Sequence, residues 1–156
     1  MKRIFRSFHP ILVLILLLIL GGCKEEFVQG RRLYEGNCAG CHMHDGTGLA
    51  DITPPLYESD YLKANIMQLP CIIRYGLFDT ILVNRIIFTD FMLGYPKLTD
   101  AEVSNICNYI AYRFLQDPTP SFSPRMVKAL TDSCRAHQHH PSMPLLRDSV
   151  RMFQSI

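Results

Sequence analysis

The chain lacks a large excess of charge of either sign, because 16 lysine and arginine side chains stand against 14 aspartates and glutamates. Three of the basic residues, Lys2, Arg3 and Arg6, lie at the N-terminus, and without them 13 basic side chains remain. The rest of the chain is therefore close to neutral and carries no basic field that a nucleic acid would bind. We expect no nucleic-acid partner.

The chain also lacks an apolar run long enough to cross a bilayer, which takes about 20 residues. The unbroken run from Ile11 to Leu20 is shorter, follows the basic N-terminus and leads into a Leu-Gly-Gly-Cys sequence ending at Cys23. This is the order of a secretory signal peptide, and its end resembles the lipobox of bacterial lipoproteins, whose cysteine is diacylated. We expect residues 1–22 to be removed, Cys23 to carry lipid and residues 23–27 to form a tether. The alternative is an uncleaved membrane anchor.

Internal repeats are absent as well, and the length suits one domain with a hydrophobic core rather than two. We expect this domain to span residues 28–116 and a C-terminal extension to span residues 117–156. The extension should contain one docked helix from Ser123-Pro124, since proline suits the first helical position, and a tail rich in proline and histidine. Helices are also predicted over residues 28–37, within 56–69, over 71–76 and, weakly, over 146–153.

The clearest helix begins after Thr99, because Glu102 three residues later completes the pattern of a capping box. Apolar residues then recur at three- and four-residue steps from Val103 to Phe114. Residues 78–88 are rich in isoleucine, leucine, valine and phenylalanine without a clear period. They fit either an extended segment or a small hairpin.

Two cysteines three residues apart, followed at once by a histidine, form the motif Cys38-Ala39-Gly40-Cys41-His42. Thiols at this spacing can add to the two vinyl groups of haem, and the adjacent imidazole then falls on the iron. A redox dithiol would need a βαβ context and a zinc site a second close pair of ligands, and the sequence offers neither. The motif predicts one covalent haem, held by Cys38 and Cys41, with His42 on the iron.

Residues 28–115 resemble the class I cytochrome c family, most of all the single-haem lipoprotein cytochromes of the Bacteroidetes type. Gly30 and Tyr34 stand eight and four residues before the first haem cysteine, where the family has a glycine and an aromatic residue. In the family this glycine lets the first helix cross the last one closely, and Ile106 and Tyr109 match the contacts on the last helix. The resemblance implies an all-α fold, with helices around one haem c and a short C-terminal extension on the outside.

The resemblance also implies a partner for the haem histidine. Pro54 follows His42 by twelve residues, where the family has a proline whose carbonyl accepts the proton of the second ring nitrogen. Such a bond fixes the tautomer and the orientation of the imidazole. The alternative is an ordinary loop proline.

Met92 matches the family's axial methionine, although Leu93 follows it where the family usually has proline. Of the competing thioethers, Met43 is too close to His42 to reach the opposite face of a haem. Met67 lies in a predicted helix, and Met143 comes after the closing helix. We therefore predict His42 and Met92 as the two axial ligands of the iron.

Arg74 matches a segment of the resembled subgroup, and a guanidinium at this position would be able to pair with a haem propionate. A solvated surface arginine fits the sequence equally well. Both interpretations stay open.

Three cysteines remain after lipid and haem, so at most one disulfide can form within the chain. Cys107 lies on the apolar stripe of its helix, where a small thiol packs well without a partner. We predict a Cys71–Cys134 disulfide that fastens the extra helix to the domain; three free thiols are the alternative.

A second histidine- and cysteine-bearing group, Cys134, His137, His139 and His140, lies at the start of the tail. Its spacing does not match a usual zinc pattern, and a solvated tail is the preferred interpretation. Adventitious copper or nickel binding is the alternative.

These features predict an electron-transfer protein rather than an enzyme, anchored by lipid to a bacterial membrane and facing the periplasm. Its partners would be redox proteins of a respiratory chain or a periplasmic reductase. Lys24-Glu25-Glu26 after the lipid cysteine also resembles acidic export signals and extends the expectation to the cell surface. Two other classes stay open: a haem-based gas sensor with an open sixth position, and a haem-free redox or interaction lipoprotein.

Overall fold

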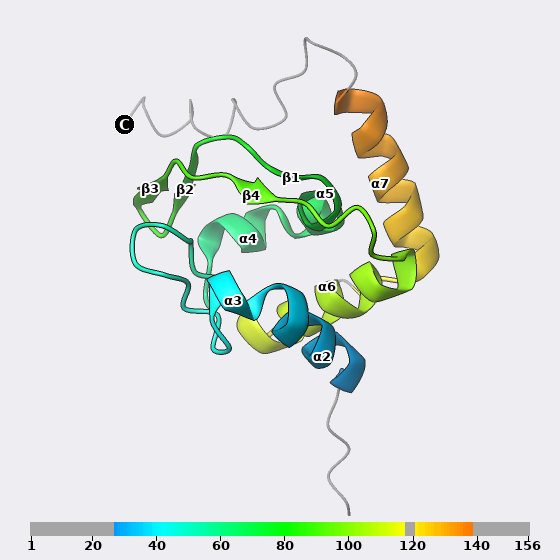
Figure 1. Cartoon of the computed structure of the whole chain (residues 1–156), viewed down its shortest axis with the longest axis horizontal. Coiled ribbons are helices and arrows are strands. Elements are labelled where there is room, and N and C mark those ends of the chain that lie inside the picture. The colour runs from blue at the N-terminus through cyan, green and yellow to red at the C-terminus, as the bar shows by residue number, and fades with distance from the viewer. Residues whose placement is uncertain (1–26, 118–120, 139–156) are drawn as a thin grey trace, which may run out of the picture.

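The computed structural model describes residues 27–117 and 121–138 (Figure 1). Six α-helices, one 3₁₀ helix and four short strands make up this part of the chain, so the helical fold predicted as all-α is confirmed, with minor strands beside the helices. In chain order the elements are α2 (Val28–Asn37), α3 (Ala39–His42), α4 (Asp60–Ala64), the 3₁₀ helix η1 (Ile66–Gln68), α5 (Leu69–Tyr75), β1 (Gly76–Leu77), β2 (Ile81–Val83), β3 (Ile86–Phe88), β4 (Met92–Leu93), α6 (Asp100–Phe114) and α7 (Pro124–Gln138). None of the described helices is long and apolar enough to cross a membrane.

The first and last helices of the domain, α2 and α6, cross at Gly30. A Cβ placed on Gly30 would collide with the backbone oxygen of Asn105 and would lie 2.7 Å from the Cβ of Tyr109. The ring of Tyr34 packs against Tyr109 and Phe114, with centroids 5.4 and 5.1 Å away. A missing side chain thus permits the close approach, and an aromatic cluster fills the space beside it.

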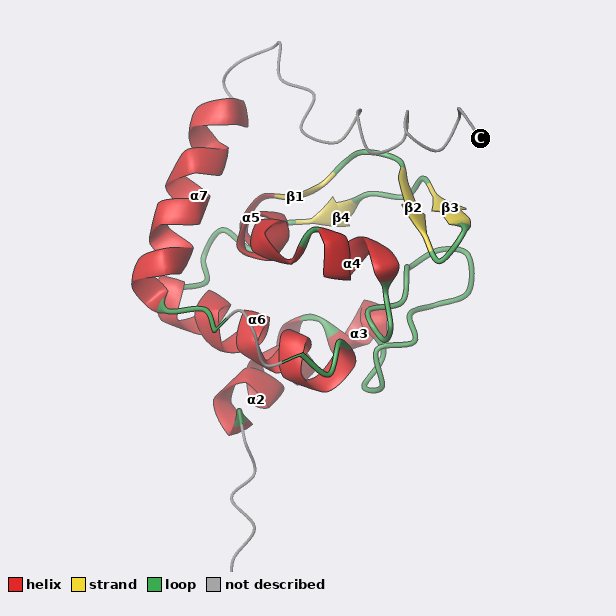
Figure 2. Ribbon diagram, turned by 180° about the vertical axis from the view of Figure 1, so that it is seen from behind, coloured by secondary structure: helices red, strands yellow, loops and turns green. Residues whose placement is uncertain are grey.

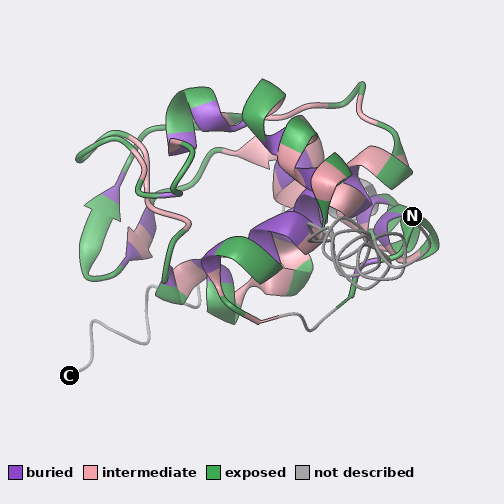
Figure 3. Ribbon diagram, turned by 90° about the horizontal axis from the view of Figure 1, so that it is seen from below, coloured by how far each residue is buried: buried purple, intermediate pink, exposed green. Residues whose placement is uncertain are grey.

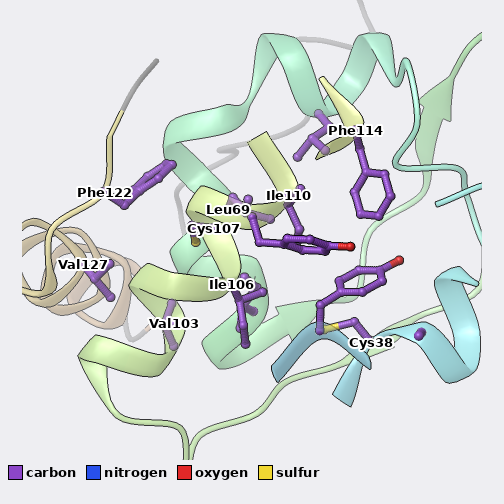
Figure 4. Close-up of a cluster of buried hydrophobic side chains, with 14 residues drawn as sticks. Cys38, Leu69, Val103, Ile106, Cys107, Ile110, Phe114, Phe122 and Val127 are labelled. Carbon is purple, nitrogen blue, oxygen red and sulfur yellow. The ribbon is translucent and has the colours of Figure 1, made fainter. Parts of the chain in front are cut away.

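Helix α6 begins as the sequence predicts. The hydroxyl of Thr99 accepts the backbone N–H of Glu102, and the carboxylate of Glu102 accepts the backbone N–H of Thr99. The apolar stripe that follows is buried and forms the centre of the core (Figures 3 and 4). In Figure 4, Phe122 and Val127 lie on one side of α6 and Cys38 lies on the other.

Helix α7 is the docked helix expected after Ser123. Hydrogen bonds from Ser104 and Asn108 of α6 to the carbonyl of Phe122 hold the segment that leads into it, at 2.7 and 2.9 Å. At its other end Cys134 is bonded to Cys71 of α5, with the two Cα atoms 6.2 Å apart. The helix predicted over residues 146–153 and the histidines at positions 139 and 140 lie outside the described residues.

In Figure 2 the strands β2 and β3 lie at the side of the molecule away from α7, and β1 and β4 lie between them and α7. Strands β2 and β3 form an antiparallel hairpin, so residues 78–88 contain the small hairpin that was one of the two expectations. Its turn residues, Asn84 and Arg85, both have positive φ, as a two-residue hairpin turn requires. Strand β4 pairs with β1, which places Met92 opposite Leu77.

Candidate cofactor site

A cavity of about 330 Å³ lies between the helices and the strands. Its walls are mostly apolar and come from segments far apart in the chain. They include Cys38, Cys41 and His42 around α3, Pro54 from the loop after α3, Ile73 from α5, Phe88 from β3, and Met92 from β4. The structure thus brings the cysteines, the histidine and the methionine singled out in the sequence to one cavity.

The two cysteines and the histidine occupy a single helical turn. Cys38 precedes α3, and its carbonyl accepts the backbone N–H groups of Cys41 and His42 at 3.1 and 2.9 Å. Cys38 is buried and Cys41 is exposed. One turn therefore presents two thiols, one at the floor and one at the edge of the cavity, beside an imidazole.

The environment of Cys38 does not suit redox dithiol chemistry. Burial raises the pKa of this thiol to about 12, and the nearby Cys41 adds to the rise. A redox-active cysteine needs a lowered pKa, since the thiolate is the nucleophile. Among the described residues no three histidine, cysteine or acidic side chains cluster as metal ligands, so a zinc site on this motif finds no other ligands there.

His42 is buried, and its orientation is fixed by one hydrogen bond. Its Nδ1 lies 3.2 Å from the carbonyl oxygen of Pro54. A carbonyl only accepts, so Nδ1 carries the proton and Nε2 keeps its lone pair. Burial lowers the pKa of His42 despite the bond to Pro54, and this lowering favours the neutral ring. A neutral imidazole with a free Nε2 is the form that binds a metal ion.

The loop that delivers Pro54 depends on a glycine. Gly48 has a φ of +73°, and a Cβ on it would lie 2.8 Å from the carbonyl carbon and oxygen of Pro54. The neighbouring residues are pinned by the bridge between Leu49 and Thr53. Only glycine combines this backbone conformation with so close an approach.

Met92 is the one methionine of the described residues that lines this cavity. Met67, one of the competitors considered from the sequence, is 40% exposed and does not line it. Met43 is also absent from the cavity wall, and Met143 lies outside the described residues. The cavity therefore offers one thioether besides the imidazole of His42.

Arg74 has partners other than the propionate considered from the sequence. Its Nη1 donates to the carbonyl of Leu98 at 2.8 Å, and its Nη2 pairs with Asp100 at 2.7 Å. It does not belong to the cavity wall. The start of α6 lies close enough to take both arms of the guanidinium, which the sequence does not reveal, and pairing with a cofactor carboxylate has no support from this geometry.

Two tyrosines of the wall were not singled out from the sequence. The Tyr61 hydroxyl is buried and has no hydrogen-bond partner among the described residues. A buried hydroxyl without a partner is costly, so it points to a polar group of a molecule that fills the cavity. Tyr95 donates to the carbonyl of Asn37 and so ties the Met92 side of the cavity to the cysteine side. No motif marks either residue.

The donor set fits a flat apolar cofactor that carries a metal and a few polar groups. Two thiols, one neutral imidazole, one thioether and one unpaired hydroxyl meet in an otherwise apolar space. Histidine and methionine are a known axial pair for haem iron, and adjacent cysteines attach the haem edge.

Comparison with the sequences of known proteins agrees with the haem site that the donor set indicates. A family model described as "Cytochrome c" matches residues 27–113. Two curated proteins from Thermus thermophilus, both named cytochrome c-552, are similar to the chain. One is 30% identical over 102 residues, covering 63% of this chain and 68% of the relative. The other is 30% identical over 87 residues, covering 53% of this chain and 66% of the relative. The family match ends before α7 begins.

Proposed function

Because the chain belongs to the cytochrome c family, whose members carry covalent haem c and act as electron carriers rather than enzymes, we propose a more specific function. The protein carries one electron at a single haem with histidine–methionine axial ligation. Cys38 and Cys41 hold the haem through thioether bonds, and His42 and Met92 are its axial ligands. The haem, when bound, supplies an iron that changes oxidation state by one electron.

The hydrogen bond between His42 and Pro54, inside a cavity that also contains Met92 and both cysteines, carries this proposal. It supports a ring held in one tautomer, with Nε2 available to the metal. A second ligand from Met92 leaves no open position on the iron. This favours electron transfer over the gas sensor that was the alternative, because a sensor needs a vacant site.

The other residues of the cavity wall suit an electron carrier. The apolar lining keeps water from the metal, which is one of the levers that set its reduction potential. The Tyr61 hydroxyl is the one buried donor there without a partner in the described structure, and we assign it to a carboxylate of the haem. Ile52, Phe91 and Leu93 line the cavity and are each more than half exposed, so electrons would leave on this side.

We place the protein outside the cytoplasm, anchored by lipid on Cys23 and serving redox proteins of a respiratory chain or a periplasmic reductase. Cys23 and the signal peptide lie outside the described residues, so the anchor rests on the sequence. The disulfide between Cys71 and Cys134 supports export, because disulfides persist in oxidising compartments.

The test is the pyridine haemochrome spectrum of the protein matured in cells that assemble c-type cytochromes. The proposal predicts one haem per chain with both vinyl groups saturated, and a spectrum shifted toward that of a single thioether in Cys41→Ala. Cys107→Ala is the matched control, since its thiol is buried and unpaired but lies outside the motif. An unchanged spectrum in both motif variants, Cys38→Ala and Cys41→Ala, would refute the attachment.

A further inference from the structure

The segment that carries Met92, residues 92–99, has little regular structure of its own. Strand β4 ends at Leu93, and α6 begins only at Asp100. Contacts with other elements must therefore set its position. One of them is the short pairing of β4 with β1, and another is the backbone N–H of Tyr95, which donates to the carbonyl of Ile73 at 2.8 Å.

The middle of the segment lies directly on the C-terminal end of α5. A Cβ on Gly94 would lie 2.5 Å from the carbonyl carbon of Tyr75 and 2.6 Å from the carbonyl oxygen of Arg74. A larger residue at position 94 would push the segment away from α5. The same turn of α5 therefore carries both this backbone contact and the Arg74 side chain.

Arg74 reaches from α5 to the far end of the segment. Its Nη1 donates to the carbonyl of Leu98, and its Nη2 binds Asp100, the first residue of α6. The side chain is only 13% exposed, and its Nε is buried with no partner among the described residues. A charge so little exposed depends on the few partners it has, and removing one of them leaves the others uncompensated.

The structure assigns Arg74 the role of a positioning residue for Met92. Pairing with β1 holds the start of the segment but not the end that leads into α6. Arg74 holds that end by joining α5 to Leu98 and Asp100. This inference rests on the proposed function, in which Met92 is an axial ligand. Without the two bonds the segment moves off α5 more often, and Met92 leaves the metal more often. The guanidinium acts through the backbone and not by touching the haem.

The experiment is imidazole binding to the oxidised, haem-loaded protein, because imidazole can bind only where Met92 has left. The apparent affinity scales with the population of the open form. Arg74→Gln should raise the apparent association constant about tenfold or more, the range expected for lost charge-assisted hydrogen bonds. Asp100→Asn should also raise the association constant. The increase in the double variant should be smaller than the product of the two single increases. Arg74→Lys, which keeps the charge, should raise the association constant less than Arg74→Gln does.

The matched control is Lys128→Gln, which breaks an exposed pair with Asp132 on α7 and should leave imidazole binding unchanged. Wild-type affinity in both Arg74→Gln and Asp100→Asn would overturn the inference. A change in Arg74→Gln with none in Asp100→Asn would overturn the part assigned to Asp100, because only the bond to the Leu98 carbonyl would then remain. If Arg74→Gln does not fold, Arg74→Lys and Asp100→Asn decide alone.

The near-infrared band of ferric iron bound to a thioether separates this inference from the proposed function. If the wild type lacks the band, Met92 is not a ligand and both fail together. If the band is present in the wild type and the imidazole affinity is the same in every variant, only the positioning role fails.

Discussion

The crossing of α2 and α6 makes a sharp prediction, because the two glycines Gly30 and Gly36 lie on the same helix in opposite surroundings. A Cβ at Gly30 meets the backbone oxygen of Asn105 and the Cβ of Tyr109, whereas a Cβ at Gly36 has no atom within 4 Å. Neither obstacle at Gly30 can rotate away, since one is backbone and the other is the root of a buried side chain. Gly30→Ala should therefore force α2 away from α6.

The magnitude follows from two opposed effects. Alanine gains about 1 kcal/mol over glycine in a helix interior, and overpacking costs about 1–3 kcal/mol. With backbone as the obstacle we take the upper end, so Gly30→Ala should lose about 2 kcal/mol net. Gly36→Ala should gain up to about 1 kcal/mol. The two variants would then differ by about 3 kcal/mol.

The assay is urea unfolding of the haem-loaded protein, followed by far-ultraviolet circular dichroism. Gly30→Ala should move the midpoint down and Gly36→Ala should leave it equal or move it up, with equal slopes in both. Because α2 leads directly into Cys38, the yield of haem-loaded protein should also fall in Gly30→Ala alone. Equal midpoints for the two variants would refute the close crossing.

Three further outcomes are expected. Cys23→Ser should release the protein from the membrane fraction or block signal processing without altering the haem spectrum, because two acyl chains anchor firmly where one does not; normal processing with extraction only by detergent would count against lipidation. Cys134→Ala should lower the free energy of unfolding by up to about 4 kcal/mol for a loop of this length, with the haem spectrum unchanged; peptide mapping of unreduced protein that finds Cys71 alkylated, or linked to Cys107, would contradict the pairing. Tyr61→Phe should lower the reduction potential by a few tens of mV, since roughly 59 mV corresponds to a tenfold change for one electron; an unchanged potential would remove Tyr61 from contact with the haem.

Local signals in the sequence were sufficient to predict where α6 and α7 begin. Thr99 and Glu102 predicted the start of α6, and both capping hydrogen bonds are present. The proline at position 124 marked the first residue of α7. The hairpin stayed ambiguous because its turn, Asn84-Arg85, has no glycine, and the usual Asn-Gly signal is missing. Reciprocal bonds between Asn84 and Asp60 hold the turn instead, and these join residues 24 positions apart.

The site was predictable where a spacing carries chemistry and hidden where tertiary contacts decide. Cys38, Cys41 and His42 form a contiguous motif, so one helical turn fixes their relation. The pairing of β1 with β4 involves two residues from each strand, too few for a period, and depends on close approaches at Gly76 and Gly94. The partners of Arg74 were hidden for the same reason, because Leu98 and Asp100 reach it only after α6 has packed on α5.

The most direct test of the central claim, that Met92 completes the ligand set of a haem held by His42 and two cysteines, is the near-infrared spectrum of the oxidised Met92→Ala variant beside the wild type. The account predicts the weak thioether–iron band in the wild type and its complete loss in Met92→Ala, with covalent haem retained. A band that survives in Met92→Ala, or that disappears in Met143→Ala instead, would contradict it.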